Sequence, residues 1–182
     1  MQQVNADVSV RPAIAGDEAA ITTVQVAAWR LAHADVLGAG VLDLLDERAM
    51  TASWRAAIIA PPGPDHRVLV ACAGPRVVGF AAVAPIAADR AEEAPGGLLV
   101  SLEVDPTDQR AGHGSRLLAA VVDLLRTDGA DQLSTWVLTG DEARKQFYRE
   151  AGLGPDGAER TLSAGRAPDG RAVTEARWSA LI

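Results

Sequence analysis

The chain contains a single cysteine, Cys72, among its 182 residues, so no disulfide can form within it. Proteins that depend on internal disulfides are mostly secreted or periplasmic, and this chain is not built in that way. Its first residues also lack the basic segment and apolar stretch of a secretory signal. We therefore expect a cytoplasmic protein in which Cys72 is buried and inert in a hydrophobic strand.

Long apolar runs and an excess of positive charge are missing as well. No window approaches the roughly 18 to 20 apolar residues that span a bilayer, and the formal net charge is −7. A protein that binds nucleic acid regardless of its sequence normally carries the opposite sign. We expect no membrane and no nucleic-acid partner, while local positive charge can still hold a small polyanion.

The chain has 48% hydrophobic residues, which at this length is enough for one domain with a hydrophobic core. We expect residues 8–182 to form this domain and residues 1–7 to be a flexible N-terminus. Period-two alternation predicts strands, and apolar residues at helical spacing predict helices. The predicted strands are 8–13, 67–73, 76–85, 97–106, 131–138, 157–165 and 172–181, and the predicted helices are about 17–38, 46–59, 112–127 and 141–152. This order predicts an α/β fold, a mixed sheet with helices on both faces, with Trp136 buried in its strand.

The turn before the helix at 112–127 has the sequence Gln109-Arg110-Ala111-Gly112-His113-Gly114. A helix start offers unpaired N–H groups and positive dipole charge, and glycine lets the backbone approach an anion closely. Arg110 and Arg116 add positive charge. A dinucleotide fingerprint would need a third glycine where Leu117 stands, and a P-loop would need Lys where Ser115 stands. The turn is therefore either a phosphate site of another kind or a loop with two flexible positions.

This turn resembles the acetyl-CoA-binding motif of the GNAT N-acetyltransferase superfamily, Gln/Arg-x-x-Gly-x-Gly/Ala after a strand. Gln109, Gly112 and Gly114 occupy the defining positions. The resemblance extends from Val8 to about Ser179. It implies the GNAT fold, a mixed and mostly antiparallel central sheet of about seven strands with helices on both faces.

A second motif lies downstream, in the stretch "DEARKQFYREAGL". It is similar to the family's Asn-x-x-Ala-x-x-Phe-Tyr-x-x-x-Gly-Phe segment, to which we match Ala143, Phe147, Tyr148 and Gly152. Leu153 replaces the final phenylalanine. Two motifs at the expected separation are far more specific than either one alone.

The resemblance implies that acetyl-CoA is the donor substrate and assigns the residues that hold it. Backbone amides of residues 110–115 would cradle the pyrophosphate. From its place inside the turn, we separately expect the side chain of His113 to point outward. Strand residues 102–104 would splay from the next strand and pair with the pantetheine arm. Asp141 stands where the family often has an asparagine that contacts pantetheine, although aspartate is also a good helix N-cap. The predicted donor site comprises Leu102, Glu103, Val104, Gln109, Arg110, Ala111, Gly112, His113, Gly114, Ser115, Asp141 and Tyr148.

Tyr148, the only tyrosine, is carried over as the general acid that protonates the leaving thiolate. A phenol with a pKa near 10 is protonated at neutral pH and can donate; the alternative is an amphipathic core residue beside Phe147. Glu103 is the candidate base, directly or through water. The alternatives are that Glu103 faces solvent or pairs with an arginine, that Glu175 is the base, or that no dedicated base exists.

The first two predicted helices are expected to wall the acceptor site. Trp29 and His33 are four residues apart, so they share a helix face, and we assign them to substrate binding; for His33 a structural role is the alternative. His66 and His113 have no partners at metal-ligand spacing, so we expect no metal.

These features together predict an N-acetyltransferase that moves an acetyl group from acetyl-CoA to a primary amine by direct transfer. The alternative is an acyl-CoA-binding sensor or interaction module that keeps the donor site without turnover. A homodimer is possible, as it is common in the superfamily.

Overall fold

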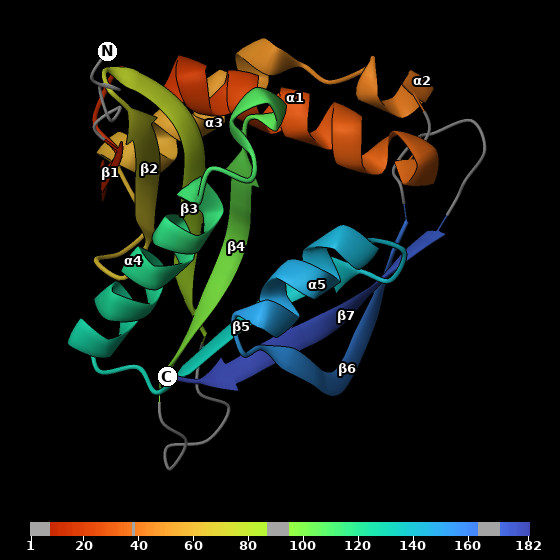
Figure 1. The fold of residues 1–182 in the computed structure, drawn as a ribbon. Helices are drawn as coiled ribbons and strands as arrows, with labels where there is room; N and C mark the ends of the chain where they lie inside the picture. The colour runs from red at the N-terminus through yellow and green to blue at the C-terminus, as the bar shows by residue number, and fades with distance from the viewer. Residues whose placement is uncertain (1–7, 38, 87–94, 164–171) are drawn as a thin grey trace, which may run out of the picture.

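The computed structural model describes residues 8–37, 39–86, 95–163 and 172–182 (Figure 1). The predicted flexible segment, residues 1–7, lies outside this range. The strands are β1 (Val8–Pro12), β2 (Arg67–Ala73), β3 (Arg76–Ile86), β4 (Gly96–Val104), β5 (Gln132–Leu138), β6 (Gly154–Ser163) and β7 (Ala172–Leu181). The helices are α1 (Glu18–Leu37), α2 (Ala39–Leu42), α3 (Glu47–Ile59), the single 3-10 turn η1 (Pro106–Asp108), α4 (His113–Thr127) and α5 (Glu142–Glu150).

The strands form one sheet in the order β1-β2-β3-β4-β5-β7-β6. Within the described chain the β4–β5 pair is parallel and every other neighbouring pair is antiparallel. The predicted fold class, a mixed and mostly antiparallel sheet of seven strands with helices on both faces, is confirmed. The short helix α2 was not predicted, and it lies where the first helix was expected to fade.

Apolar side chains fill both faces of the sheet. On one face, Ile21 and Val24 of α1 pack with Val70 and Phe80, and Trp54 of α3 lies edge-on to Phe80 at 4.9 Å. On the other face, residues of α4 and α5 form the larger core cluster with β2, β3, β4, β5 and β7. Figure 1 shows α4 and α5 lying in front of the sheet, with β4 between α4 and β5.

Helix starts follow local side-chain chemistry. Asp46, predicted as a first helical residue, is the N-cap of α3, and the N-cap alternative for Asp141 is confirmed at α5. Each carboxylate accepts from the amide three residues later at 2.9 Å. These bonds satisfy amides that have no partner inside the helix.

The predicted burial of Trp136 is wrong. Leu133 and Val137 are buried in β5, whereas Trp136 is only half-buried on the opposite side of the strand. The guanidinium carbons of Arg160 and Arg177 lie 4.3 Å and 6.0 Å from the centre of its ring. Strand alternation sends successive side chains to opposite faces, and Val137 takes the core-facing position.

Cys72 is buried in β2, as expected. None of the helices in the described residues is both long and apolar enough to cross a bilayer.

Candidate active site

The parallel strands β4 and β5 diverge partway along their length. They pair from Gly96↔Gln132 to Leu99↔Thr135, and the described structure shows no pairing between them beyond that point. The hydroxyl of Thr135 donates to the carbonyl of Leu99 at 2.9 Å where the strands part. The register of β4 against β3 shifts at Val100, and such a bulge bends a strand and increases its twist. Beyond the bulge, β4 keeps β3 on one edge and has a free edge on the other.

The free edge of β4 presents the peptide groups of Leu102 and Val104. The amide of Asp105 donates to Val78 of β3 at 2.8 Å, and peptide groups alternate in direction along a strand. Leu102 and Val104 therefore direct their N–H and C=O groups away from β3. A strand-like ligand could pair with this edge as an added strand does.

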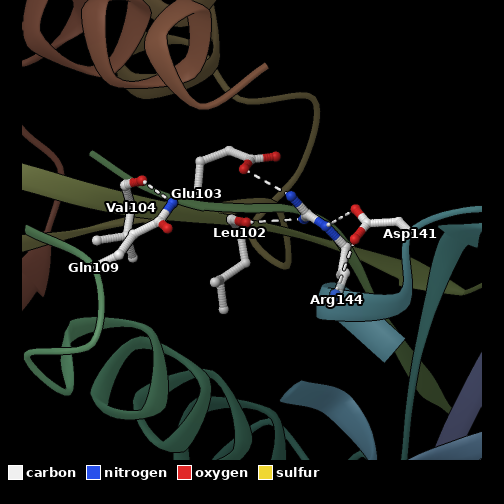
Figure 2. A network of polar contacts seen from close by, with 6 residues as sticks. All are labelled: Leu102, Glu103, Val104, Gln109, Asp141 and Arg144. Atoms are coloured by element: carbon white, nitrogen blue, oxygen red, sulfur yellow. Dashed lines mark hydrogen bonds and ion pairs between the residues drawn. The ribbon is translucent and has the colours of Figure 1, made fainter. Parts of the chain in front are cut away.

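Side chains already donate to both carbonyls of this edge (Figure 2). Gln109 Nε2 donates to the carbonyl of Val104 at 3.2 Å. Arg144 Nη1 reaches from α5 to the carbonyl of Leu102 at 3.0 Å. Gln109 was a predicted site residue, but Arg144 was not.

The turn after β4 leads into α4 through two left-handed residues, Arg110 with φ 62° and Gly112 with φ 82°. Gly112 is the N-cap of α4 and supplies no side-chain cap. The amides of residues 113–115 are the first of the helix, where no intrahelical partner exists. Together with the dipole of a 15-residue helix, they provide a place for an anion.

Charged and polar side chains surround this turn. Arg110 and Ser115 are exposed, and Arg116 folds back so that its Nη1 donates to the carbonyl of Ala111 at 3.1 Å. Arginine side chains on both sides of the turn therefore add positive charge to the amides of the helix start.

The expectation that His113 points outward is wrong, because its side chain is buried. His113, Leu117 and Val121 lie four residues apart along α4, so they share the face that packs against the sheet. His113 can therefore contribute its backbone amide to the turn but not an exposed imidazole.

A groove of about 400 Å³ runs between α4 and α5, beginning at the turn. Ser115 and Phe147 line the end near the turn, and Val122 and Ala151 line it further along. A Cβ built on Gly114 would lie 3.5 Å from the ring of Phe147, so the start of α4 and the middle of α5 are in close contact. The groove has the position and the mixed lining needed to hold a flat, partly polar ligand next to the turn.

Three charged side chains meet across the splay. Arg144 Nη2 donates to Glu103 Oε2 at 2.8 Å, and its Nε donates to Asp141 Oδ2 at 3.3 Å. The side chains of Glu103, Asp141 and Arg144 are 7%, 10% and 20% exposed. Burial lowers the pKa of Arg144, but the charge of Glu103, together with Tyr148, the hydrogen bond to Glu103 and the charge of Asp141, outweighs burial and raises the pKa above its ordinary value, so the guanidinium stays charged. Of the alternatives for Glu103, pairing with an arginine is the one that the structure shows.

Tyr148 lies on the inner side of α5 and is 1% exposed. Burial raises the pKa of its phenol, against the opposite effects of the Arg144 charge and the Thr135 hydroxyl. The phenol is therefore protonated at neutral pH and close to both sides of the splay. This arrangement allows proton donation.

His33 and Trp29 reach the same region from α1, with ring centroids 6.4 Å apart. His33 is 9% exposed, and its Nδ1 is buried without a hydrogen-bond partner in the described residues. Burial lowers the pKa of His33, and the positive charge of Arg144 lowers it further, while Glu103 and Asp141 oppose the change. His33 is therefore a neutral imidazole at neutral pH, near the Arg144 cluster.

Two assignments made from the sequence are revised: the alanine position of the second motif and the candidate base Glu175. Counting three residues from Asp141 places Arg144, not the exposed Ala143, at the motif's alanine position. Glu175, the second candidate base, bonds to Arg160 Nε at 2.6 Å on the β6–β7 ribbon. Its carboxylate is thus engaged outside the Arg144 cluster.

Sequence reasoning missed Arg144 and Thr135. The departure from alanine three residues after Asp141 was the available signal for Arg144. Thr135 carried no signal, because a threonine in a buried strand is common. Among the described residues, no three His, Cys, Asp or Glu side chains are grouped in a way that could hold a metal ion.

Comparison with known families supports the motif assignment. The model of the Acetyltransferase (GNAT) family matches residues 38–153, which include the free edge of β4, the turn before α4 and all of α5. No curated protein sequence matches the chain.

Solved structures share the fold along nearly the whole chain. PaiA N-acetyltransferase from Thermoplasma acidophilum, crystallised with coenzyme A, superposes with a TM-score of 0.78 at 14% identity, covering 97% of this chain and 99% of its own. A GCN5-related N-acetyltransferase from Rhodopseudomonas palustris gives 0.68 at 20% identity, with 100% of both chains covered. Ribosomal-protein-alanine N-acetyltransferase from Brucella melitensis gives 0.66 at 20% identity, covering 96% and 99%. At these identities the likeness concerns the fold.

Proposed function

Because the chain belongs to the acetyltransferase (GNAT) family and is an acyltransferase, we propose that it moves an acetyl group from acetyl-CoA directly to a primary amine of a small molecule or peptide. The observation that carries this proposal is the free edge of β4, which runs from the turn at Gly112 toward Tyr148. One extended ligand can contact the turn, the edge and the phenol together.

The donor would lie along these features in order. Its pyrophosphate would accept hydrogen bonds from the amides at the start of α4, with Arg110 and Arg116 beside them. The adenine end of the donor would lie in the groove between α4 and α5. The pantetheine amides pair with Leu102 and Val104, which directs the thioester toward Tyr148.

Acetyl transfer then needs one bond formed and one broken. The amine nitrogen attacks the thioester carbon, the carbon–sulfur bond breaks, and the thiolate takes the phenolic proton of Tyr148. The proton lost by the amine goes to Glu103, directly or through water. Oε2 of Glu103 is bonded to Arg144, and Oε1 makes no hydrogen bond within the described residues, so Oε1 is the oxygen available for this step.

The acceptor would approach from the side of α1. Trp29 offers an aromatic surface and His33 a neutral imidazole there. Two carboxylates, Glu103 and Asp141, face one guanidinium in this region, so the cluster has a net negative charge. This balance favours acceptors that arrive as cations and lose one proton to solvent before the neutral amine attacks.

The test is thiol release from acetyl-CoA with a panel of amines, together with calorimetry of coenzyme A binding. We expect release that depends on the acceptor, and faster release with cationic small amines than with neutral or acidic ones. Coenzyme A that fails to bind at millimolar concentration would contradict the whole assignment.

The second candidate is an acyl-CoA sensor without turnover. It is favoured by Arg144, whose guanidinium lies on the edge that the donor arm needs and which replaces the alanine of the family motif. Binding of coenzyme A, with no thiol released from acetyl-CoA in the presence of any amine of the panel, would support the sensor.

Cytoplasmic location and a homodimer stay predictions, which fractionation and sedimentation would check.

A further inference from the structure

Arg144 bridges the splay between α5 and β4. Its backbone lies in the first turn of α5, and its side chain crosses to the carbonyl of Leu102 and the carboxylate of Glu103 (Figure 2). Asp141 holds the same residue twice, through the backbone amide at 2.9 Å and through Nε at 3.3 Å. The guanidinium is therefore fixed in position by two carboxylates as well as by the strand.

The carbonyl of Leu102 has two uses that exclude each other. A pantetheine arm that pairs with β4 must lie in the gap between β4 and α5, which is the gap that the guanidinium crosses. A carbonyl oxygen has two lone pairs and could accept from two donors, so the conflict is one of space: the guanidinium and the arm need the same gap. The bonds to Glu103 and Asp141 lie at the side of the edge and do not use it.

We propose that Arg144 competes with the donor arm for the Leu102 carbonyl, so that the guanidinium turns about its Nε anchor on Asp141 when the donor binds, leaves this carbonyl and then faces the acyl group. This inference rests on the proposed function. In this proposal Arg144 lowers the affinity for acetyl-CoA and also donates a hydrogen bond to the thioester oxygen during the reaction.

The freed Nη1 has a task in the transfer step. As the amine attacks, negative charge develops on the thioester oxygen, and a positioned N–H donor stabilises that charge. Asp141, which lies on the same helix, holds Nε in place once the donor is bound, so little further reorganisation is needed at the moment of reaction. Arg144 thus opposes binding of acetyl-CoA and assists its reaction. Removing the guanidinium should therefore tighten coenzyme A binding and lower kcat.

The experiment compares wild type with Arg144→Met, and uses Arg149→Met as the matched control. Arg149 is on the same helix but exposed, where it contacts Gln146 and the ring of Trp178. In R144M the Leu102 carbonyl has no competitor, so calorimetry should show coenzyme A binding about 2- to 10-fold tighter. At saturating acetyl-CoA the kcat should fall roughly 100-fold, while R149M leaves both values unchanged.

A purely structural arginine would weaken binding and turnover together, so tighter binding with slower turnover distinguishes the two roles. Unchanged or weaker coenzyme A binding in folded R144M would overturn the inference while leaving the proposed function intact. Wild-type protein that binds no coenzyme A would overturn both.

Arg144→Lys covers the case in which R144M does not fold. Lysine keeps the charge beside Glu103 and Asp141 but lacks the planar fork that also reaches the strand. Tighter coenzyme A binding with reduced kcat in R144K supports the competition, and wild-type values for both would refute it.

Discussion

Two opposite influences act on the pKa of the Tyr148 phenol: burial raises it and the positive charge of Arg144 lowers it. Burial keeps the phenol of Tyr148 protonated, and the charge of Arg144 favours the phenolate that remains after the proton has gone. A proton donor needs both properties, because it must hold its proton before the reaction and release it during the reaction. The two residues are four apart on α5, so one helix face carries both.

Tyr148→Phe tests the acid. Loss of the hydroxyl removes the proposed proton donor and leaves the backbone of the proposed coenzyme A site unchanged, so we expect kcat for acetyl transfer to fall roughly 100-fold or more. The dissociation constant for coenzyme A should stay within about twofold of wild type. An equal loss of binding, measured by calorimetry, would assign the phenol a structural role instead.

His33 makes stability depend on pH. Its folded-state pKa lies below the unfolded value near 6.5, so the unfolded chain binds a proton that the native chain resists. The stabilising effect is complete above the unfolded pKa and is lost as pH falls below it toward the folded pKa. In urea unfolding, His33→Gln should therefore lose less free energy of unfolding than wild type when pH falls from 7.5 to 5.5. Parallel losses in the two proteins would show that another group causes the pH dependence.

The turn into α4 shows how one element makes a binding surface from its backbone. The left-handed residue Gly112 starts the helix without a side-chain cap, and this leaves the first amides of α4 for a ligand. An aspartate or serine cap would satisfy those amides and close the site. The missing cap therefore fits the proposed binding of a pyrophosphate at this turn, whereas Asp46 and Asp141 cap the helices α3 and α5.

Gly112→Ala should damage the turn more than the fold. A Cβ at φ 82° is strained, and it would meet the guanidinium of Arg116 at 2.8 Å. We expect a loss of about 1 kcal/mol in stability and roughly tenfold weaker coenzyme A binding through misplaced amides. Gly152→Ala is the matched control, because φ there is 91° with open space around a Cβ. It should lose similar stability by thermal unfolding but bind coenzyme A normally, and equal binding losses in both variants would argue against a special role for the turn.

At the scale of the whole molecule, the splay divides the sheet into two parts. β1 to β4 form one part and β5, β7 and β6 the other, and four residues of each strand pair between them, 96–99 with 132–135. Beyond Leu99 the Arg144 bonds join the parts from α5 to β4. A donor that touches β4, α4 and α5 would therefore bind both parts of the sheet and stabilise the native state.

Coenzyme A should raise the stability of the whole protein by mass action. At a concentration 100 times its dissociation constant, the gain is about 2.7 kcal/mol if it binds only the folded chain. Thermal unfolding should move to higher temperature, and hydrogen exchange should slow at residues 102–104 and at the first turns of α4 and α5. A shift of the same size in G112A at the same coenzyme A concentration would show that the turn is not part of the site.

Much of the fold could be predicted from the sequence. The strands at 67–73, 131–138 and 172–181 agree with β2, β5 and β7 to within a residue, because alternation and Gly/Pro punctuation report the local environment. Periodicity does not say which of two faces a neighbour covers, so Trp136 was placed on the wrong side. His113 was misjudged because it was assigned to the turn, although its spacing of four from Leu117 already placed it on the apolar face of α4.

The amino-acid sequence by itself determined the family, the order of the elements and the turn that can hold a pyrophosphate, because motif spacing and side-chain periodicity are local properties. Only the tertiary structure brought Glu103, Asp141 and Arg144 together from β4 and α5 and placed His33 of α1 near them. Their separation in the chain carries no information about distance in space. The packing of α1 and α5 against opposite sides of the splay decides which charges meet.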